Sequence, residues 1–235
     1  MSAPDRSDSS LPAMAPTEEG LAPAGWAQRS AALLQEHLAR LQGRDLHLFA
    51  YGSLIWRPEF EHDGQWLARV QGFHRALRMR SRVYRGTPGR PGLVLALLSG
   101  GCCTGLVYRI AAARAPEVLR QVWEREMVNG SYQARWLRCH ALPGQAPLSD
   151  SAPLALGFTL SRRSPQCSGL LSDGEVLGVL RHAHGRYGSS LEYLERTVLS
   201  LRQRGICDRE LERLYGLALG HGLCAAAAPA LRAGA

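Results

Sequence analysis

The order of strand-like and helix-like patterns along the 235 residues is the feature that most restricts the fold. Short apolar runs bounded by Gly, Pro or Ser dominate the first two-thirds of the chain, whereas apolar residues at helical spacing dominate the last third. A regular parallel α/β sheet would instead alternate strands and helices throughout. The pattern therefore favours an α+β fold.

The same patterns predict where the individual elements lie. Apolar residues at helical spacing predict a first helix that starts near Trp26 and ends at Gly43. Residues 45–50 alternate as in a strand, which opens into a tight loop at Tyr51-Gly52-Ser53-Leu54 (the 51–54 loop). Further strands are predicted at 67–70, 75–79, 93–98, 105–110 and 154–160, a turn at 88–92, and helices at about 115–128, 174–184, 190–202 and 208–219.

One folded domain is expected in a chain of this length. Residues 1–24 are rich in Ser, Pro, Ala and Asp and have no apolar periodicity, which predicts a disordered tail. The Ala-rich end, residues 224–235, is predicted to be frayed or disordered. We therefore expect the domain to span residues 25–223.

Composition argues against several classes of protein. No stretch approaches the ~18 consecutive apolar residues of a membrane span, and the opening MSAPDRSDSS lacks the basic-then-apolar order of a signal peptide, so a cytoplasmic location is expected. The net charge of +8 would suit a nucleic-acid binder, but the Arg residues are scattered and form no stripe with interleaved aromatics, so nucleic acid is not an expected partner. The six cysteines show no CxxC pair or metal-finger spacing, which predicts reduced, mostly buried thiols.

The predicted helix at 115–128 carries the strongest candidate for a catalytic group. Val118, Val122 and Glu126 are four residues apart and share the apolar face, whereas Glu124 lies on the solvent side. A carboxylate on an apolar face must be paired, protonated or functional. Burial would raise its pKa towards that of a general base working near neutral pH. From this pattern alone, a structural ion pair with an Arg explains Glu126 equally well.

The 51–54 loop is the second candidate. A strand that opens into successive backbone N–H groups can form an anion-binding nest, which would suit a carboxylate or a developing oxyanion. Taken alone, the tetrapeptide is more typical of an ordinary turn. Ser53 is not expected to be an acyl nucleophile, because the chain has no GxSxG elbow around it.

Other polar residues have weaker functional interpretations. Tyr132 could hydrogen-bond Glu126 or a substrate, or could equally be a half-buried tyrosine. Arg57 and Arg75 could bind a substrate carboxylate, although solvated arginines are commoner. His182 and His184 diverge on a helix and have no evident third ligand, so no metal site is expected there.

Several motifs occur in one order along residues 46–219, and together they resemble the ChaC-type γ-glutamylcyclotransferases. They are Phe49-Ala-Tyr-Gly-Ser-Leu-Ile-Trp-Arg-Pro58, Gly72-Phe73-His74-Arg75, Arg85-Gly86-Thr87-Pro88, Gly105-Leu106-Val107-Tyr108-Arg109, Trp123-Glu-Arg-Glu126-Met127 with Gly130 and Tyr132, and Leu191-Glu192-Tyr193-Leu194.

The resemblance implies a small mixed β-barrel flanked by helices that acts on γ-glutamyl compounds, chiefly glutathione. The implied reaction gives 5-oxoproline and cysteinylglycine, with Glu126 as general base and then acid, and without a metal or organic cofactor. The implied substrate-binding residues are Leu48, Phe49, Ala50, Tyr51, Gly52, Ser53 and Leu54, with Tyr132 as a further candidate.

Two positions depart from the family pattern, and the residues leave two other functions open. Ala50 stands where relatives often have Gly, and Cys167 where many have Tyr, which bears on affinity or selectivity. The first alternative is a cyclotransferase for other γ-glutamyl amino acids or amines. The second is a non-catalytic protein that binds a small acid and regulates another protein. No oligomeric state is predicted.

Overall fold

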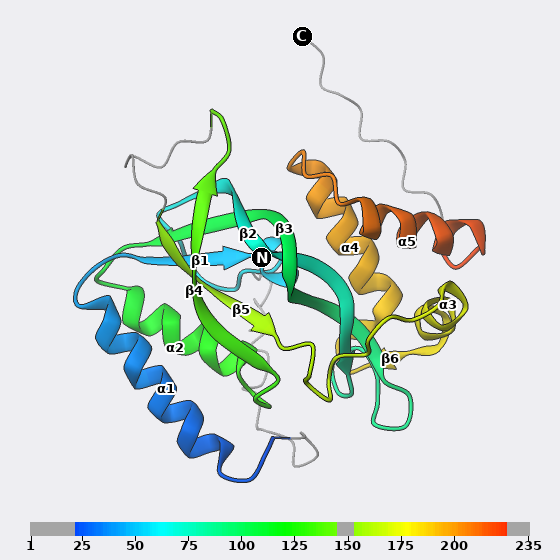
Figure 1. Ribbon diagram of the computed structural model, residues 1–235, viewed down its shortest axis with the longest axis horizontal. Helices are drawn as coiled ribbons and strands as arrows, with labels where there is room; N and C mark the ends of the chain where they lie inside the picture. Colours follow the sequence, from blue (N-terminus) through cyan, green and yellow to red (C-terminus); the bar gives the residue numbers. More distant parts are fainter. Residues whose placement is uncertain (1–21, 145–152, 225–235) are drawn as a thin grey trace, which may run out of the picture.

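A closed barrel of five strands forms the centre of the computed structural model, which describes residues 22–144 and 153–224 (Figure 1). The strands follow the order β1-β3-β2-β4-β5 around the barrel. β1 pairs with β5 in parallel, and the other neighbours are antiparallel, so the predicted mixed barrel is confirmed. The strands are β1 (Leu46–Ala50), β2 (Gly64–Ser81), β3 (Gly92–Ile110), β4 (Tyr132–Ala141) and β5 (Leu154–Leu160).

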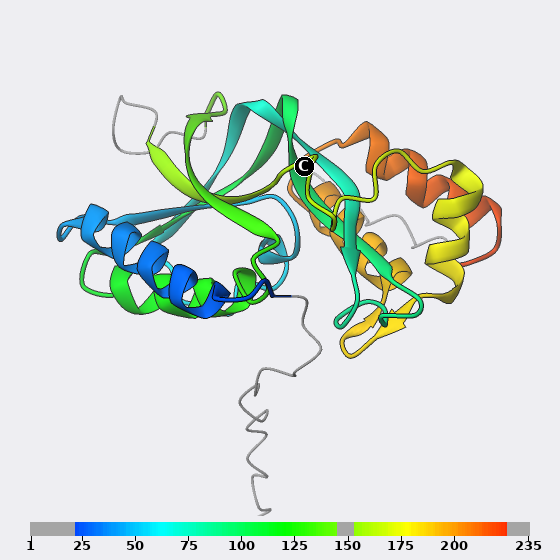
Figure 2. The same ribbon diagram turned by 60° about the horizontal axis from the view of Figure 1, so that its bottom comes forward.

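Helices cover the barrel in two groups, which Figures 1 and 2 show on different sides. α1 (Trp26–Leu41) and α2 (Ala115–Glu126) pack against each other on one side. α3 (Asp173–His182), α4 (Ser190–Gln203) and α5 (Arg209–Gly220) contact one another on the other side, where α4 also packs on β3. A short 3-10 helix, η1 (Ser53–Ile55), follows β1, and a two-stranded ribbon, β6 (His184–Gly185) with β7 (Gly188–Ser189), precedes α4.

The interior of the barrel is apolar, and it extends into the contacts with α2. β1 and β5 are buried along most of their length, which explains why β5 is an almost continuous apolar run and why the alternation expected for β1 is weak in its burial. Val118, Leu119, Val122 and Trp123 form the buried face of α2. Because these residues recur at helical spacing, they fix the rotation of α2 against the barrel, and with it the direction of the helix end.

The predicted strands are confirmed in position, with two differences. The runs 67–70 and 75–79 are both parts of β2, and 93–98 and 105–110 are both parts of β3. The pairing of β2 with β3 shifts register between Gln71 and Phe73, and such a bulge bends a ladder without ending it. β4 was not predicted, although its burial alternates along much of its length. The predicted turn at 88–92 is confirmed by the Thr87–Arg90 bridge.

Some predictions concern residues that the structure does not describe. Residues 1–21 and 225–235 lie outside the described part, so the two predicted tails remain predictions. Within the described part, no helix is long and apolar enough to cross a membrane.

The thiols are free, but the expectation that most are buried is wrong, because only Cys103 and Cys139 are buried and the other four are half-buried or exposed. Cys102 lies in an exposed run of β3, residues 99–102, and Cys207 lies in the loop between α4 and α5.

Candidate active site

A small pocket lies where β1 ends, beneath the C-terminal end of α2 and beside α4. It brings together the two strongest sequence candidates, the 51–54 loop and Glu126, although 72 or more residues separate them in sequence. Tyr132 at the start of β4 also lines it. Three further residues complete the wall: Leu95 of β3, Phe158 of β5 and Tyr193 of α4.

The carboxylate of Glu126 is the one acidic group among the described residues that line this pocket. Its side chain is only 14% exposed, and Glu124 is exposed, as the helical pattern predicts. Burial raises the pKa of Glu126; the adjacent Arg125, whose Nε lies 3.2 Å from Oε1, lowers the pKa, and the carboxylate of Glu59 raises it. Glu126 therefore has an ion-pair partner and also faces a pocket, so the structural and the functional interpretation do not exclude each other.

Indole N–H groups anchor the end of α2 that carries Glu126. Trp26 of α1 donates to the carbonyl of Met127 at 2.9 Å, and Trp123 donates to the hydroxyl of Ser30 at 2.9 Å. Gly130 then turns the chain towards β4 with φ of 67°, and a Cβ there would lie 2.9 Å from the Trp26 ring. Glycine is required at this point both by the left-handed backbone and by the close approach of the indole.

The 51–54 loop leaves β1 in a 3-10 turn whose first N–H groups are not used within the turn. The N–H groups of Ile55 and Trp56 bond the carbonyls of Gly52 and Ser53. The N–H groups at the start of such a turn have no partner inside it, so those of Ser53 and Leu54 can receive an anion. A Cβ on Gly52 would lie 3.1 Å from the Tyr193 hydroxyl, so a side chain here would press on the pocket wall.

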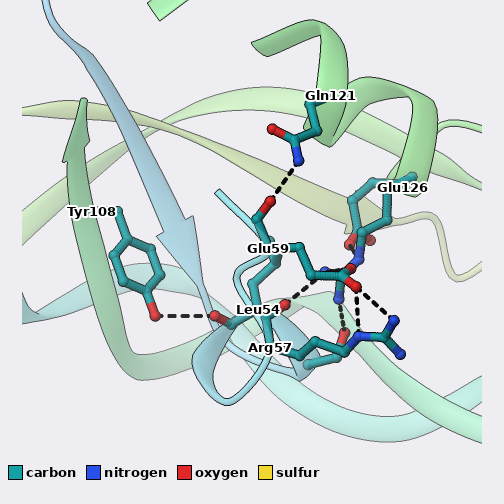
Figure 3. Close-up of polar contacts among 8 residues, drawn as sticks. Leu54, Arg57, Glu59, Tyr108, Gln121 and Glu126 are labelled. Atoms are coloured by element: carbon teal, nitrogen blue, oxygen red, sulfur yellow. Dashed lines mark hydrogen bonds and ion pairs between the residues drawn. The ribbon is translucent and has the colours of Figure 1, made fainter. Parts of the chain in front are cut away.

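Two buried side chains hold this loop by its carbonyl groups. Arg75 donates from Nε to the carbonyl of Tyr51 and from NH2 to that of Thr104 at 2.7 Å, and its NH1 pairs with Asp208 at 2.7 Å. Tyr108 donates to the carbonyl of Leu54 at 3.0 Å, a contact drawn in Figure 3. The loop is therefore fixed at both ends by the barrel.

Three tyrosine hydroxyls surround the carboxylate. Tyr51 donates to the carbonyl of Phe158 and Tyr132 to that of Leu95, both at 2.8 Å, while Tyr193 accepts from the N–H of Leu95 at 3.3 Å. Burial, together with the nearby Glu126, raises the pKa of Tyr51 and Tyr132 well above 10.0 and that of Tyr193 to about 12. All three phenols are therefore neutral near pH 7.

The structure separates the other sequence candidates from the pocket. Leu48, Phe49 and Ala50 lie in β1, are at most 1% exposed, and do not line the pocket. Arg75 is buried and does not line the pocket, and its guanidinium group already makes the three contacts described above. Arg57 pairs with Glu59 at 2.6 Å. Arg75 is thus not free for a substrate carboxylate, and Arg57 does not line the pocket.

Sequence reasoning did not single out several residues of the site. Leu95, Phe158 and Tyr193 come from distant strands and a helix, so only the tertiary fold reveals that they meet. Tyr193 gave one weak signal, since it is a polar-tipped residue on the apolar stripe of α4. No sequence signal indicated a role in the site for Arg125 or Glu59, because charged residues are common on helix and loop surfaces.

Comparison with known proteins places this arrangement in a family. The family model for ChaC-like protein matches residues 46–218, which contain the barrel, the 51–54 loop, Glu126 and most of the C-terminal helices. The chain belongs to the ChaC-like family. The resemblance seen in the sequence motifs is therefore confirmed.

Similar proteins from bacteria and animals are named for one activity. The chain is 30% identical to the glutathione-specific γ-glutamylcyclotransferase of Escherichia coli (strain K12), over 80% of this chain and 78% of that protein. It is 29% identical to the human glutathione-specific γ-glutamylcyclotransferase 1, over 64% of this chain and 67% of that protein. A crystal structure of a yeast γ-glutamyl cyclotransferase specific to glutathione matches with a TM-score of 0.66 at 22% identity, covering 76% of this chain and 97% of that one, which supports the fold.

Proposed function

We propose that this ChaC-like protein cyclises the γ-glutamyl group of glutathione, which gives 5-oxoproline and releases cysteinylglycine. The observation that carries the proposal is the carboxylate of Glu126, shielded from water and with a raised pKa, in a pocket below the 51–54 loop. The named activity of the relatives supports the same reaction. The reaction takes place within one substrate molecule, so the protein has mainly to hold a folded conformer and move protons.

In the proposed reaction, the α-amine of the glutamyl group attacks its own γ-carbonyl carbon. Glu126 takes one proton from the α-ammonium group, and the freed amine forms the new C–N bond that closes the five-membered lactam. The lactam nitrogen loses its second proton to solvent, and the bond to the cysteinyl nitrogen breaks. The same carboxyl group then returns the proton to the departing amine, so one residue serves as base and then as acid. A raised pKa suits both steps, because it makes the carboxylate a better base and keeps its protonated form accessible near neutral pH.

The polar groups of the pocket complement the two ends of an α-amino acid. Tyr51 and Tyr132 donate to backbone carbonyls, and their two hydroxyl groups also lie within hydrogen-bonding range of each other. Their remaining lone pairs can accept a hydrogen bond beside the Glu126 carboxylate. That side suits an ammonium group. The N–H groups of Ser53 and Leu54 are donors and suit the α-carboxylate or the developing oxyanion. This division assigns binding to the loop backbone and proton transfer to Glu126, with no nucleophilic role for Ser53.

The decisive experiment is incubation of the protein with glutathione and, separately, with γ-glutamyl-alanine, followed by measurement of 5-oxoproline. Release from glutathione alone is the expected result. Release from γ-glutamyl-alanine would indicate a cyclotransferase with broader substrates, and release from neither would favour a protein that binds a small acid without catalysis.

The location in the cytoplasm is likewise a proposal, consistent with an intracellular substrate.

Replacing Glu126 tests the catalytic assignment. Glu126→Gln keeps the shape of the side chain but cannot accept the ammonium proton, so turnover should fall by roughly 10²–10⁴-fold, the usual contribution of a general acid–base group. Glu124→Gln is the matched control, because Glu124 is exposed on the same helix and should keep full activity. Activity near the wild-type level in Glu126→Gln would refute the assignment.

A further inference from the structure

The guanidinium group of Arg125 contacts Glu126 on its own helix and joins that helix to the loop region by three further contacts. Its Nε lies 3.2 Å from Oε1 of Glu126, its NH2 donates to the Ser53 hydroxyl at 3.0 Å, and its NH1 donates to the carbonyl of Arg57 at 2.6 Å. The same NH1 pairs with Oε2 of Glu59 at 2.7 Å. Figure 3 shows Arg57, Glu59 and Glu126 gathered around this point.

This pattern is one that only an arginine can make. The guanidinium presents its donors in a rigid plane, so its contacts to Ser53, Glu59 and Glu126 fix the relative positions of three groups at once. The Arg125 side chain is 25% exposed, which leaves these contacts partly shielded from solvent. A lysine at the same position would keep the charge but would lose the fork.

Glu59 is itself held in an unusual backbone conformation. Its φ is 58°, in the left-handed region, which is unfavourable for a residue with a Cβ. Such a conformation persists where the surroundings hold it. Here Gln121 of α2 donates to the Glu59 carbonyl, and both Arg57 and Arg125 bind its carboxylate. Glu59 is thus tied to α2 through its backbone and through its side chain.

We propose that Arg125 and Glu59 are positioning residues for the reaction: Arg125 aims the Glu126 carboxylate at the substrate loop, and Glu59 holds Arg125 in place and balances its charge. The proposal rests on the proposed function, since it assigns these residues a role through Glu126. Neither residue lines the pocket, so neither is assigned contact with substrate.

The two residues act on Glu126 in opposite directions. The cation of Arg125 lowers the pKa of Glu126, and the anion of Glu59 raises it, while burial makes the largest contribution and raises it. The other titratable groups that face Glu126 are the phenols of Tyr51 (end of β1), Tyr84 (after β2), Tyr132 (β4) and Tyr193 (α4), whose pKa values are all raised. Those phenols stay neutral below pH 10, so Arg125 and Glu59 are the charged groups that set the balance.

The test compares the pH dependence of kcat/KM in wild type, Arg125→Gln and Glu59→Gln. The acidic limb of this profile reports the pKa of the free enzyme's general base. In Arg125→Gln the limb should move to higher pH, and turnover should fall by roughly 10–100-fold because the carboxylate is misplaced. In Glu59→Gln the limb should move to lower pH. Arg125→Lys should keep the limb near that of wild type and recover part of the lost turnover.

A matched control and a second measurement keep the result unambiguous. Arg120→Gln changes an exposed arginine on the same helix, bonded only to the carbonyl of Pro116 among the described contacts, and should leave the profile unchanged. Carbon-13 NMR of glutamate carboxyl groups, with the Glu126 signal assigned by Glu126→Gln, gives the pKa of Glu126 without any turnover. It therefore tests the inference even if wild type releases no 5-oxoproline, an outcome that would overturn the proposed function alone.

The inference is overturned if Arg125→Gln and Glu59→Gln move the pKa of Glu126 in the same direction, or move it not at all, while thermal unfolding shows both to be folded. If Arg125→Gln does not fold, Glu59→Gln and Arg125→Lys decide the question, because each keeps a hydrogen-bonding group of similar size in place. A lower pKa of Glu126 in Glu59→Gln together with an unchanged pKa of Glu126 in Arg125→Lys supports the proposal, and any other pair of results contradicts it.

Discussion

At the scale of the single residue, Glu126 combines a functional requirement with a cost to stability. Its carboxylate is largely shielded from water, and its pKa is raised in the folded protein above the ordinary value of 4.5. A group with a raised pKa binds its proton more tightly in the folded than in the unfolded state. Its favourable contribution to folding is therefore complete below pH 4.5 and is lost as pH rises through the raised pKa.

The substitution Glu126→Gln should accordingly raise the melting temperature at pH 7, although it removes activity. The amide carries no charge to desolvate and still offers an oxygen to Arg125. Each kcal/mol gained corresponds to about 2–4 °C in a protein of this size. Thermal unfolding followed by circular dichroism between pH 4 and pH 8 measures the effect.

The gain should shrink as the pH falls through the raised pKa of Glu126 and should be gone below pH 4.5, where the wild-type carboxyl group is protonated in both states. The exposed control Glu124→Gln should show neither the gain nor its pH dependence. A melting temperature of Glu126→Gln below that of wild type at pH 7 would mean that the ion pair with Arg125 outweighs the cost of burial.

At the scale of the element, the end of α2 matters more than its length. The helix stops at Glu126, and the chain reverses through Gly130 into β4, with the Trp26 ring packed against that glycine. The direction of the carboxylate thus depends on a turn and on an indole from α1, neither of which touches the pocket.

Gly130→Ala should destabilise the protein and reduce turnover together. The left-handed φ of 67° costs a residue with a Cβ about 1–2 kcal/mol, and the Trp26 ring must also move. Gly178→Ala is the control, because Gly178 lies inside α3 with no atom within 4 Å of a Cβ and should stabilise by about 0.5–1 kcal/mol. Urea unfolding gives both free energies. Equal stabilities for the two variants would show that the turn at Gly130 is not strained.

The elements also show how far sequence reasoning reaches. Helical spacing predicted the face on which Glu126 lies, because that spacing is a local property of α2. The strand-like patterns are interrupted near residues 72 and 100, and each interruption predicts the end of a strand. In the structure, pairing between β2 and β3 continues on both sides of these interruptions. Tyr193 reaches the site only through tertiary contacts, and Arg125, although it adjoins Glu126 in sequence, meets Ser53 only through the fold. Local patterns thus predict elements and their faces, and the fold decides which faces meet.

At the scale of the whole molecule, a buried ion pair connects the barrel with the C-terminal helices. Arg75 of β2, whose side chain is 2% exposed, pairs with Asp208, and Asp208 caps α5 by accepting from the N–H of Leu211. The same arginine holds the carbonyl of Tyr51 at the pocket. We propose on this basis that residues 25–223 form one cooperative domain, in which the C-terminal helices support the site.

Replacing Asp208 tests that coupling. Asp208→Ala leaves the buried cation of Arg75 without its carboxylate and removes the cap of α5, so it should cost roughly 3–5 kcal/mol. Asp208→Asn should lie between alanine and wild type, because its single oxygen can serve Arg75 or the Leu211 N–H but not both. Asp173→Ala is the control: Asp173 pairs with Arg213 on the surface, both are about half exposed, and its loss should cost less than about 1 kcal/mol.

Urea unfolding should be followed by far-ultraviolet circular dichroism and by tryptophan fluorescence. If the molecule is one cooperative unit, the two probes report the same shifted midpoint in Asp208→Ala. If the C-terminal helices instead form a separate unit, the two transitions separate. The carbonyl of Tyr51 keeps its bond to Arg75 only while that arginine stays in place, so in this case the KM for glutathione should rise before the barrel unfolds.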